Sequence, residues 1–557
     1  MKKALAMILA ATMAFSLVAC GGAPASGSTE GSTAASTTGT ASTEGKKTLA
    51  VQVGTNLETI DPGLNTAADV SNMIITMFEP LLIMDENNTV QPGQAEKWEV
   101  SEDGLTWTFT LRDGLKWSNG ESLTAEDFVY TLNRIADPKT AAPYGETAVG
   151  MIKGYDEVTA GTADSLAVSA PDEKTLVIEL AYPCSYFDKM AAFAALSPVN
   201  KTVVEADPDG WCTKPETYVS NGPYMMKEWT VGQQIVCEKN PHYNGGWDKD
   251  KVVTDEITFL LMEDSTAAYT AYQTNQAQLI KNVPSEEIPS LTPASEGGDF
   301  HVEPIMGTSY ISFNAEKEPF NDPLVRKALT LAVDREYITN VLMEGTGIPA
   351  YNVVGPGISD NGSSEFVENS SKDAIPDDYE TCIAQAQQAL AEAGYPGGEG
   401  FPVITYTTND AGHSKVIAEY MQTQYKDVLG IDMKVEIVEW ASFTAMRRAG
   451  DYEMARNGWV MDYDDASNTL ETFISDNGNN DGKVSIPEVD QAMEASKVGD
   501  SAEHFAQLHK AEDVLMENYA VAPLTYSTDV WLQSPSLKGS WHSPYGYWYL
   551  QYAYVEE

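Results

Sequence analysis

Residues 447–465 read R-R-A-G-D-Y-E-M-A-R-N-G-W-V-M-D-Y-D-D and combine opposed charges, an indole and two glycines in one short stretch. Residues 441–448 are expected to form a helix. Gly450 can end that helix, because glycine readily adopts the left-handed backbone found at helix C-termini. Residues 452–455 are then predicted to form a short strand. This order of helix and strand is typical of an open α/β sheet.

Three side chains follow the predicted strand: Arg456, Trp459 and Asp462. In open α/β sheets, ligands bind in the crevice beyond the carboxyl ends of the strands. These side chains are therefore predicted to face a cleft and not the core. A surface turn that holds a salt bridge is the alternative, because Asp and Arg also mark solvated loops.

Composition and charge narrow the class of protein. The chain has 557 residues, 43% of them hydrophobic, which is enough for several cores and for two or three domains. Its 82 acidic and 34 basic residues give a formal net charge of −48 at pH 7. A field of that sign repels nucleic acid, so no nucleic-acid partner is expected. Beyond the N-terminus, no apolar run reaches the about 18 residues that a membrane span needs.

The N-terminus has the pattern of an export signal. Two lysines precede an apolar segment at residues 4–17, and L-V-A-C at residues 17–20 follows. These four residues resemble a bacterial lipobox. The resemblance implies a signal peptide over residues 1–19 and a lipid anchor on Cys20, on the outer face of the cytoplasmic membrane or in a Gram-negative periplasm. An ordinary secretory signal with a chance cysteine is the alternative.

Residues 20–47 are almost wholly Gly, Ala, Ser and Thr. Such a segment cannot bury a core, so we expect a flexible linker between the anchor and the folded region. A long linker of this kind is typical of Gram-positive surface lipoproteins.

Periodicity outlines the first part of the folded region. Residues 48–53 are an apolar run of strand length, and residues 71–78 are expected to form a helix. Residues 106–111 alternate with period two between Asp-Gly turns, as in an antiparallel strand with one wet face. Residues 124–130 read T-A-E-D-F-V-Y and predict a helix capped by its threonine.

A second group of patterns lies further along the chain. Residues 401–407 predict a strand, residues 414–429 a helix that Gly430 ends, and residues 431–437 a strand that alternates with period two. Together they predict a βαβ unit. Residues 321–332, which begin N-D-P, predict a capped helix with an apolar stripe.

A series of motifs carries a family resemblance. In chain order they are I-D-P (60–62), F-E-P-L (78–81), A-E-K-W (95–98), S-E-D-G-L-T-W-T-F-T-L-R-D-G-L-K-W-S-N-G (101–120), T-A-E-D-F-V-Y (124–130), A-D-P-K-T-A-A-P-Y (136–144), N-G-P-Y (221–224), E-K-N-P-H-Y (238–243), P-F-N-D-P-L-V-R-K-A-L-T-L-A-V-D-R (319–335) and L-A-E-A-G-Y (390–395). Their order resembles that of the oligopeptide- and dipeptide-binding proteins of ABC importers. The resemblance extends from about residue 48 to the C-terminus.

The resemblance implies an α/β fold of the bilobal type II periplasmic-binding-protein kind with an additional α/β subdomain. Lobe I would comprise residues 48–78, 202–307 and 524–557, and the extra subdomain residues 79–201. Lobe II would comprise residues 308–523. Ligand would be enclosed between the lobes by hinge closure.

The resemblance also implies binding roles. G-W-V-M-D-Y at residues 458–463 places Asp462 where family peptide binders hold the peptide α-ammonium, and places Trp459 beside a side-chain pocket. Arg447 and Arg456 match basic positions that meet the peptide carboxylate, and arginine suits bidentate capture of a carboxylate.

Three further positions are implied with less local support. His413 and Lys317 match basic positions used for longer ligands, and Tyr144 matches a tyrosine that contacts the peptide backbone. For His413 and Lys317 singly, an ordinary surface residue is the alternative. Arg448, beside Arg447, is an alternative for that basic position.

The function implied is that of a membrane-anchored extracellular solute-binding protein that captures oligopeptides and delivers them to an ABC transporter permease. Alternatives are a binder of a nickel chelate, haem or opine on the same fold, a receptor for signalling peptides and, more distantly, a secreted hydrolase. No G-x-S-x-G, H-E-x-x-H or G-x-x-x-x-G-K-[ST] motif occurs, so we expect no enzyme and no catalytic residue.

Neither a cofactor nor a metal is expected. Cys184, Cys212, Cys237 and Cys382 show no C-x-x-C or Cys/His spacing, and pairing among them is left open. Residues 477–488 come near to a calcium loop, but their first position is Asn where such loops have Asp.

Overall fold

The computed structural model describes residues 45–54, 57, 59–361, 364–409, 412–497 and 501–556, apart from the side chain of residue 441. Met1–Gly45 and Lys46–Glu557 are separate units, and only the second is considered below. Cys20, the predicted signal peptide and the linker up to residue 44 lie outside the described residues. Within the described part, no helix is long and apolar enough to cross a membrane.

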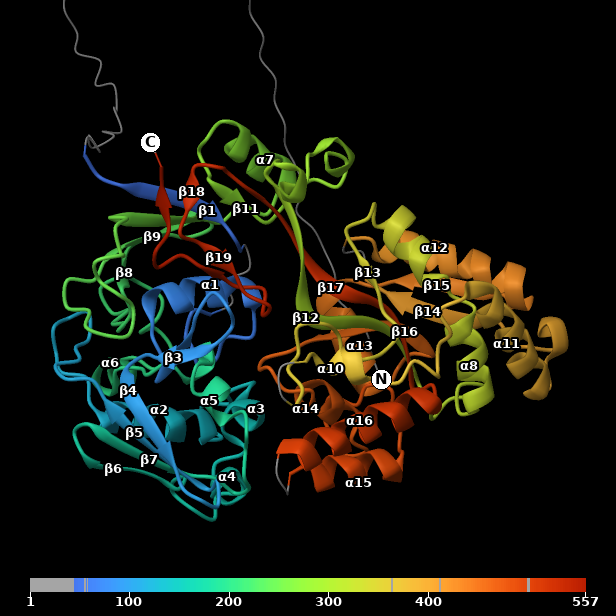
Figure 1. Cartoon of the computed structure of the whole chain (residues 1–557), viewed down its shortest axis with the longest axis horizontal. Helices are drawn as coiled ribbons and strands as arrows, with labels where there is room; N and C mark the ends of the chain where they lie inside the picture. Colours follow the sequence, from blue (N-terminus) through green and yellow to red (C-terminus); the bar gives the residue numbers. More distant parts are fainter. Residues whose placement is uncertain are drawn as a thin grey trace, which may run out of the picture. The chain divides into compact units, whose positions relative to one another are not determined.

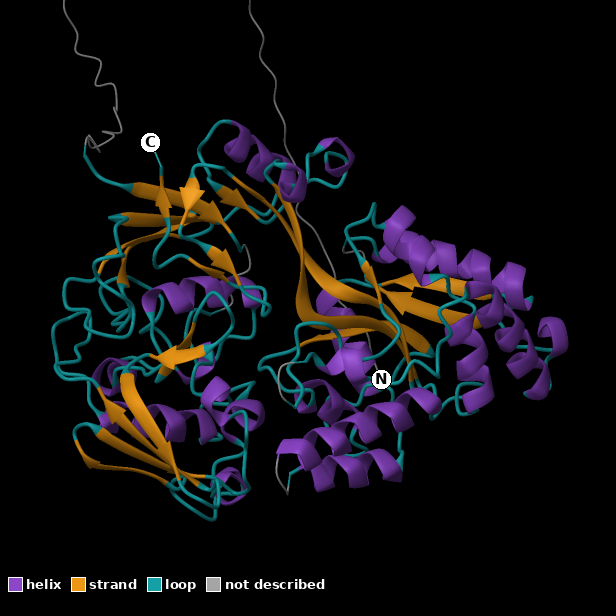
Figure 2. Ribbon diagram, in the orientation of Figure 1, coloured by secondary structure: helices purple, strands orange, loops and turns teal. Residues whose placement is uncertain are grey.

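An 11-stranded sheet runs through Lys46–Glu557 in the order β15-β14-β16-β12-β17-β11-β1-β10-β9-β8, with β13 beside β17 (Figures 1 and 2). The strands are β1 (Thr48–Gln52), β8 (Tyr224–Thr230), β9 (Gln234–Lys239), β10 (Glu256–Leu260), β11 (Leu279–Ile280), β12 (Phe300–Phe313), β13 (Ile348–Pro349), β14 (Ile404–Thr408), β15 (Met433–Ile437), β16 (Met454–Val460) and β17 (Val521–Gln533). Short pairs are β2 (Leu82–Met84) with β3 (Val90–Pro92), β18 (Leu537–Lys538) with β21 (Tyr554–Val555), and β19 (Trp541–His542) with β20 (Trp548–Tyr549).

Helices lie in the connections between the strands. They are α1 (Ala68–Met77), α2 (Ala125–Ala136), α3 (Gly145–Val149), α4 (Tyr155–Thr159), α5 (Phe187–Met190), α6 (Lys201–Ala206), α7 (Ser265–Gln273), α8 (Pro323–Leu331), α9 (Arg335–Tyr337), α10 (Phe366–Asn369), α11 (Tyr379–Glu392), α12 (Ser414–Gln424), α13 (Trp440–Ala449), α14 (Ser467–Leu470), α15 (Pro487–Ser496) and α16 (Ser501–Glu517). Helix α1 begins three residues before the expected residue 71.

Two long strands, β12 and β17, are shared by the two lobes (Figure 1). They pair antiparallel, with register shifts between Pro304 and Thr308 and between Ser309 and Tyr310 of β12. On one side they continue into β11 and β1, and on the other into β16 and β14. The bilobal α/β architecture is the one that the sequence predicts. The predicted residue limits of the lobes and of the extra subdomain stay predictions.

A smaller sheet has the order β4-β5-β7-β6, with β4 (Ala95–Val100), β5 (Thr106–Leu111), β6 (Val168–Asp172) and β7 (Thr175–Glu179). Strand β5 pairs antiparallel with both neighbours and alternates between buried and half-buried residues, as its sequence predicts. Helix α2 begins after Thr124, whose backbone N–H donates to the Asp127 carboxylate at 2.8 Å. The predicted strand and capped helix are both confirmed.

The predicted βαβ unit is also confirmed. Strands β14 and β15 are parallel neighbours, and α12 with one π-helical turn, Tyr425–Leu429, connects them. Gly430 follows with φ of 74°, the left-handed conformation that glycine adopts without strain. The helix predicted to follow N-D-P is α8, in which the Leu324 N–H donates to the Asp322 carboxylate at 2.8 Å.

The strand predicted over residues 452–455 is wrong in its limits. Helix α13 and Gly450, with φ of 74°, lie where expected, but β16 runs from Met454 to Val460. The reason is tertiary pairing: β16 pairs antiparallel with β12 along its whole length, from Met454 with Phe313 to Val460 with Gly307. This ladder extends the strand through polar residues that local propensity assigns to a loop.

The I-D-P motif joins two segments of the first lobe and α2. The Asp61 carboxylate accepts hydrogen bonds from Arg134 at 2.6 and 3.1 Å and from the Trp211 indole N–H at 3.1 Å. It also accepts from the Gly63 N–H at 3.0 Å, and the residue is 1% exposed. Elsewhere, all four described cysteines are buried free thiols.

Candidate functional site

Asp462 lies just beyond the carboxyl end of β16 and is held there by Asn468 of α14. The Asn468 side-chain oxygen accepts from the Asp462 backbone N–H and from the Trp459 indole N–H, each at 3.0 Å. Asn468 itself is 0% exposed. One buried amide therefore fixes both the acid and the indole that the sequence predicts at this site.

The Asp462 carboxylate is only partly satisfied by its neighbours. Its residue is partly buried, and that burial raises the pKa of Asp462 to about 7, although the nearby Tyr144 hydroxyl and Asn468 oppose the rise. Among the described residues, its Oδ2 atom has no hydrogen-bond partner and the carboxylate has no ion-pair partner. Burial, reinforced by the charge of Asp462, in turn raises the pKa of Tyr144. A cation placed here would relieve both effects.

Small cavities surround Asp462. One of about 100 Å³ is lined by both Tyr144 and Asp462, and a second of about 20 Å³ also reaches Asp462. Both cavities share Phe193, Ala194, Tyr545 and Tyr547. The structure therefore brings Tyr144, from a loop before α3, to the predicted acid.

The predicted Arg447 is engaged within the protein. Its Nε atom lies 2.7 Å from Oδ2 of Asp481, and the two side chains are 13% and 6% exposed. Its Nη1 donates to the Arg456 carbonyl at 3.4 Å. Arg448, in contrast, is exposed. Of the two adjacent arginines, Arg447 is thus the one that faces inward.

Arg456 lies within β16 and has no carboxylate partner among the described residues. Its Nη1 donates to the Asn409 side-chain oxygen at 3.3 Å. Burial lowers the pKa of Arg456, with the charge of Arg447 acting in the same direction and Tyr406 opposing it. A ligand carboxylate would therefore meet a partly desolvated guanidinium.

One edge of β16 is open between these two charges. Strand β14 pairs with β16 only at Met454 and Ala455, whereas β12 covers the other edge up to Val460. In the described part of the chain, no strand pairs with residues 457–460 on the β14 side. An extended peptide can add to such an edge through main-chain hydrogen bonds.

His413 and Lys317 are not brought into contact with Asp462 or Arg456 by any hydrogen bond or ion pair between described residues. His413 precedes α12 and is partly exposed. Lys317, also partly exposed, lies in the turn after β12, where its backbone N–H donates to the Asn314 carbonyl at 3.0 Å. Their predicted roles stay predictions.

Comparison with known proteins places the chain in a family. The model described as bacterial extracellular solute-binding proteins, family 5 Middle, matches residues 89–481. The chain belongs to this family. The oligopeptide-binding protein OppA of Bacillus subtilis is 33% identical over 522 residues, covering 91% of this chain and 93% of that one. The resemblance to peptide-binding proteins of ABC importers is thereby confirmed.

Two further relatives of this family 5 protein carry a ligand in their names. The crystal structure of Haemophilus influenzae OppA in complex with RPPGFSPFR has a TM-score of 0.78 and 30% identity, and covers 92% of this chain and 99% of that one. The probable deoxycholate-binding periplasmic protein YgiS of Escherichia coli is 33% identical over 507 residues, covering 89% of this chain and 91% of its own length.

In this solute-binding protein, a bridge that the sequence did not reveal lies two residues beyond Asp462. The Lys189 ammonium, next to the end of α5, lies 2.6 Å from Oδ2 of Asp464, and the side chains are 22% and 3% exposed. The Ser359 N–H also donates to Asp464, at 2.6 Å. Lys189 and Asp464 are 275 positions apart, and no local motif marks Lys189.

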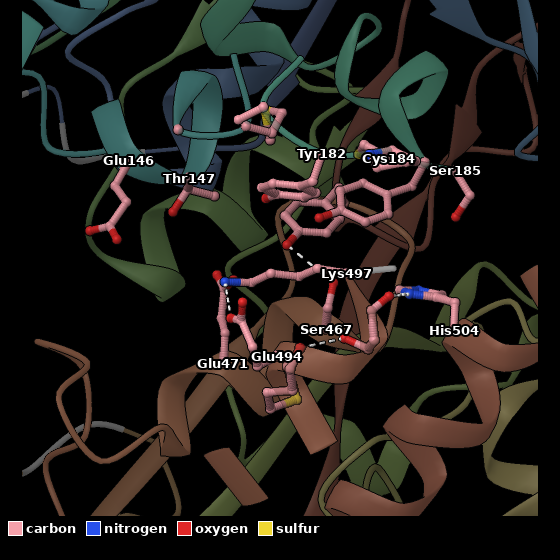
Figure 3. A pocket seen from close by; sticks show the side chains of 18 of the residues that line it. Glu146, Thr147, Tyr182, Cys184, Ser185, Ser467, Glu471, Glu494, Lys497 and His504 are labelled. Atoms are coloured by element: carbon pink, nitrogen blue, oxygen red, sulfur yellow. Dashed lines mark hydrogen bonds and ion pairs between the residues drawn. The ribbon is translucent and has the colours of Figure 1, made fainter. Parts of the chain in front are cut away.

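A cavity of about 680 Å³ lies beside the same loop (Figure 3). Tyr186 and Tyr463 both line it and stack on each other, with ring centroids 4.7 Å apart and planes at 7°. Burial raises the pKa of Glu471, on its wall, to about 8, with the charge of Asp462 as the next cause. The labelled lining residues are Glu146, Thr147, Tyr182, Cys184, Ser185, Ser467, Glu471, Glu494, Lys497 and His504.

Residues 477–488, which come near to a calcium loop in sequence, make contacts within the protein. Asp481 pairs with Arg447, and the Asn480 side-chain N–H donates to the Val484 carbonyl at 2.7 Å. Among the described residues, no group of three or more His, Cys, Asp or Glu side chains could hold a metal ion.

Proposed function

We propose that this chain is an extracellular solute-binding protein that captures oligopeptides between its lobes and delivers them to an ABC transporter permease. The observation that carries the proposal is the open edge of β16 with an unpaired carboxylate, Asp462, at one end and Arg456, without an acidic partner, at the other. A peptide with free termini presents the complementary charges, ammonium and carboxylate, at the two ends of an extended backbone.

The spacing of the two charges suits a short peptide. Arg456 and Asp462 are six positions apart. At about 3.3 Å per residue, their backbones are separated by roughly 20 Å. An extended peptide spans at most about 3.5 Å per residue, so roughly three to five residues fit once the reach of the arginine side chain is subtracted.

The remaining predicted residues take supporting roles in the proposal. Tyr144 closes the cavity around the peptide N-terminus, and Trp459 forms the wall beside the first side chains. His413 and Lys317 would meet the carboxylates of longer peptides. Arg447 would act beside Arg456.

Anchoring and lobe limits belong to the same proposal. A lipid on Cys20 would hold the protein at the outer face of the membrane. Lobe I would comprise residues 48–78, 202–307 and 524–557 with the subdomain 79–201, and lobe II residues 308–523. The protein would bind its ligand without chemical change, so incubated peptides would stay intact.

A second candidate is a non-peptide solute. The E. coli relative named as a probable deoxycholate-binding protein is as similar in sequence as the B. subtilis oligopeptide-binding protein. The two candidates differ at Asp462, because a bile acid carries no ammonium that needs a buried carboxylate.

The test is to identify and rank ligands. Protein purified under native conditions is denatured, and the released compounds are analysed by mass spectrometry. Calorimetry then compares one peptide with free termini, its N-acetylated form and its C-terminal amide. Peptides in the released fraction and much tighter binding of the free form support the proposal. Equal affinities of the free and N-acetylated forms would overturn it.

A further inference from the structure

The ion pair between Arg447 and Asp481 is built into the arginine end of the cleft. Asp481 is fixed from several directions: the Tyr452 hydroxyl donates to its carbonyl at 2.7 Å, and the Asn457 side chain donates to its Oδ2 at 3.3 Å. The same Oδ2 receives Nε of Arg447 at 2.7 Å. A buried acid held in this way cannot leave its arginine without becoming a buried, unpaired charge.

The pair lies directly beside the unpaired guanidinium. Nη1 of Arg447 donates to the Arg456 carbonyl at 3.4 Å, and the charge of Arg447 contributes to the lowered pKa of Arg456. The other groups around the pair, Tyr310 and Tyr452, carry no charge at neutral pH because burial raises the pKa of each. Among Arg447, Arg456 and Asp481, the charge is therefore two guanidinium groups against one carboxylate.

We propose that Asp481 is a specificity-determining residue that limits this end of the cleft to ligands with a single carboxylate. Asp481 offsets Arg447, whereas Arg456 has no acidic partner among the described residues and can pair with the ligand carboxylate. The inference rests on the proposed function and assigns a role to a residue that does not touch the peptide.

The chemical consequence is a preference among peptide C-termini. A neutral C-terminal residue brings one carboxylate, which pairs with Arg456. A C-terminal Glu or Asp brings a second carboxylate, which would have to compete with Asp481 for Arg447. That competition leaves one of two acids buried without a partner, so doubly anionic C-termini are disfavoured.

The experiment uses the full chain and two tetrapeptides of alanine that end in Gln or Glu. Isothermal calorimetry at one pH and ionic strength gives the ratio of their dissociation constants for the wild type, for Asp481→Asn and for Arg447→Gln/Asp481→Asn. Arg448→Gln is the matched control, because it removes the adjacent but exposed arginine.

We expect the wild type to bind the Gln peptide at least about 10-fold more tightly than the Glu peptide, and Asp481→Asn to shift this ratio at least about 10-fold toward Glu. The double variant should return to the wild-type ratio, since its arginine is gone, and Arg448→Gln should not change it. A merely structural role of Asp481 would weaken both peptides alike.

Three results would overturn the inference. One is a wild type that binds the Glu peptide as tightly as the Gln peptide, a measurement that needs no variant to fold. The second is an unchanged ratio in folded Asp481→Asn. The third is the same shift in the single and double variants. Failure of the wild type to bind either peptide would overturn the proposed function as well.

Discussion

Two aspartates of this protein, Asp61 and Asp462, differ in how fully their carboxylates are hydrogen-bonded. The Asp61 carboxylate accepts four hydrogen bonds, which come from Arg134, Trp211 and Gly63. Asp462 has an oxygen without a hydrogen-bond partner among the described residues, and its pKa is raised to about 7 by burial. Buried acceptors are nearly always satisfied, so an exception needs a reason. We therefore interpret Asp61 as an acid that stabilises the fold and Asp462 as an acid that pairs with a ligand cation.

The largest expected effect is a loss of stability when Asp61, the fully hydrogen-bonded acid, is replaced. Asp61→Ala leaves Arg134, whose side chain is 10% exposed, without its ion partner. Removing one member of a buried pair typically costs about 3–5 kcal/mol, so the free energy of unfolding should fall by about that amount. Urea unfolding measures it. The folded variant should keep its peptide affinity; an equal loss of stability in Asp462→Ala would erase the contrast.

Replacement of Asp462, the acid with an unpartnered oxygen, should instead weaken peptide binding. Asp462→Asn should weaken the binding of a peptide with a free N-terminus by about 100- to 1000-fold, or about 3–4 kcal/mol, because the ammonium loses its buried partner. Calorimetry with the free and N-acetylated forms of one peptide measures it. The acetylated form serves as control, since it should bind weakly to both proteins. A variant with unchanged affinity for the free peptide would show that Asp462 is an ordinary loop acid.

Asp464 sharpens the comparison, because it is a satisfied acid whose partner, Lys189, comes from another segment. Lys189→Met should weaken peptide binding about 30-fold, or about 2 kcal/mol, less than the loss for a fully buried pair because the lysine is 22% exposed. Lys153→Met is the control: that lysine pairs with Glu179 at the surface and is 63% exposed. Lys189 belongs to the predicted subdomain of lobe I and Asp464 to predicted lobe II, so this bridge would help to hold the two lobes around a peptide. Equal effects of the two variants would contradict that role.

The smallest expected effect is a dependence on pH. Burial raises the pKa of Asp462 from its unfolded value of about 3.9 to about 7. The folded protein therefore keeps this carboxyl protonated up to a higher pH than the unfolded chain does. The contribution of Asp462 to stability therefore falls as pH rises from about 4 to about 7 and is level above that range. Taken in full, a rise of that size would correspond to about 4 kcal/mol, but solvent screens the partly exposed carboxylate. Asp462→Asn, which has no such proton to lose, should therefore be more stable than the wild type by about 1–2 kcal/mol at pH 8, with little difference at pH 4.

Thermal melts of both ligand-free proteins between pH 4 and 8 give the difference. Buried acids whose pKa does not depend on Asp462 cancel in it, whereas Glu471, whose pKa is raised by burial and by the charge of Asp462, adds to it. Peptide affinity of the wild type should rise over the same range, because only the ionised acid pairs with the ammonium. A difference between the two proteins that is constant with pH would contradict the raised pKa.

Local patterns in the sequence predicted the elements that local interactions stabilise. Strand β5 lies at the predicted residues, and the β14-α12-β15 unit follows from alternation and from Gly430 at the helix end. Strand β16 was placed too early, because its limits come from pairing with β12, more than a hundred positions away along the chain. Periodicity within a short window carries no trace of such a partner.

The same reason explains which residues of the candidate site the sequence predicts and which it does not. Asp462, Trp459 and Arg456 were predicted from one stretch and a family motif. Their partners were not: Asp481 is 34 positions beyond Arg447, in a segment whose spacing suggested calcium, and Lys189 is 275 positions before Asp464. Only the folded chain shows which charges are already used.

The shared strands β12 and β17 have a consequence for how the protein unfolds. Because each strand belongs to both lobes, neither lobe can lose its sheet while the other keeps a complete one. The register shifts between Pro304 and Thr308 leave few ladder bonds to resist bending, yet the chain is continuous through them. We therefore expect the lobes to hinge about this point but to unfold together, as one cooperative unit.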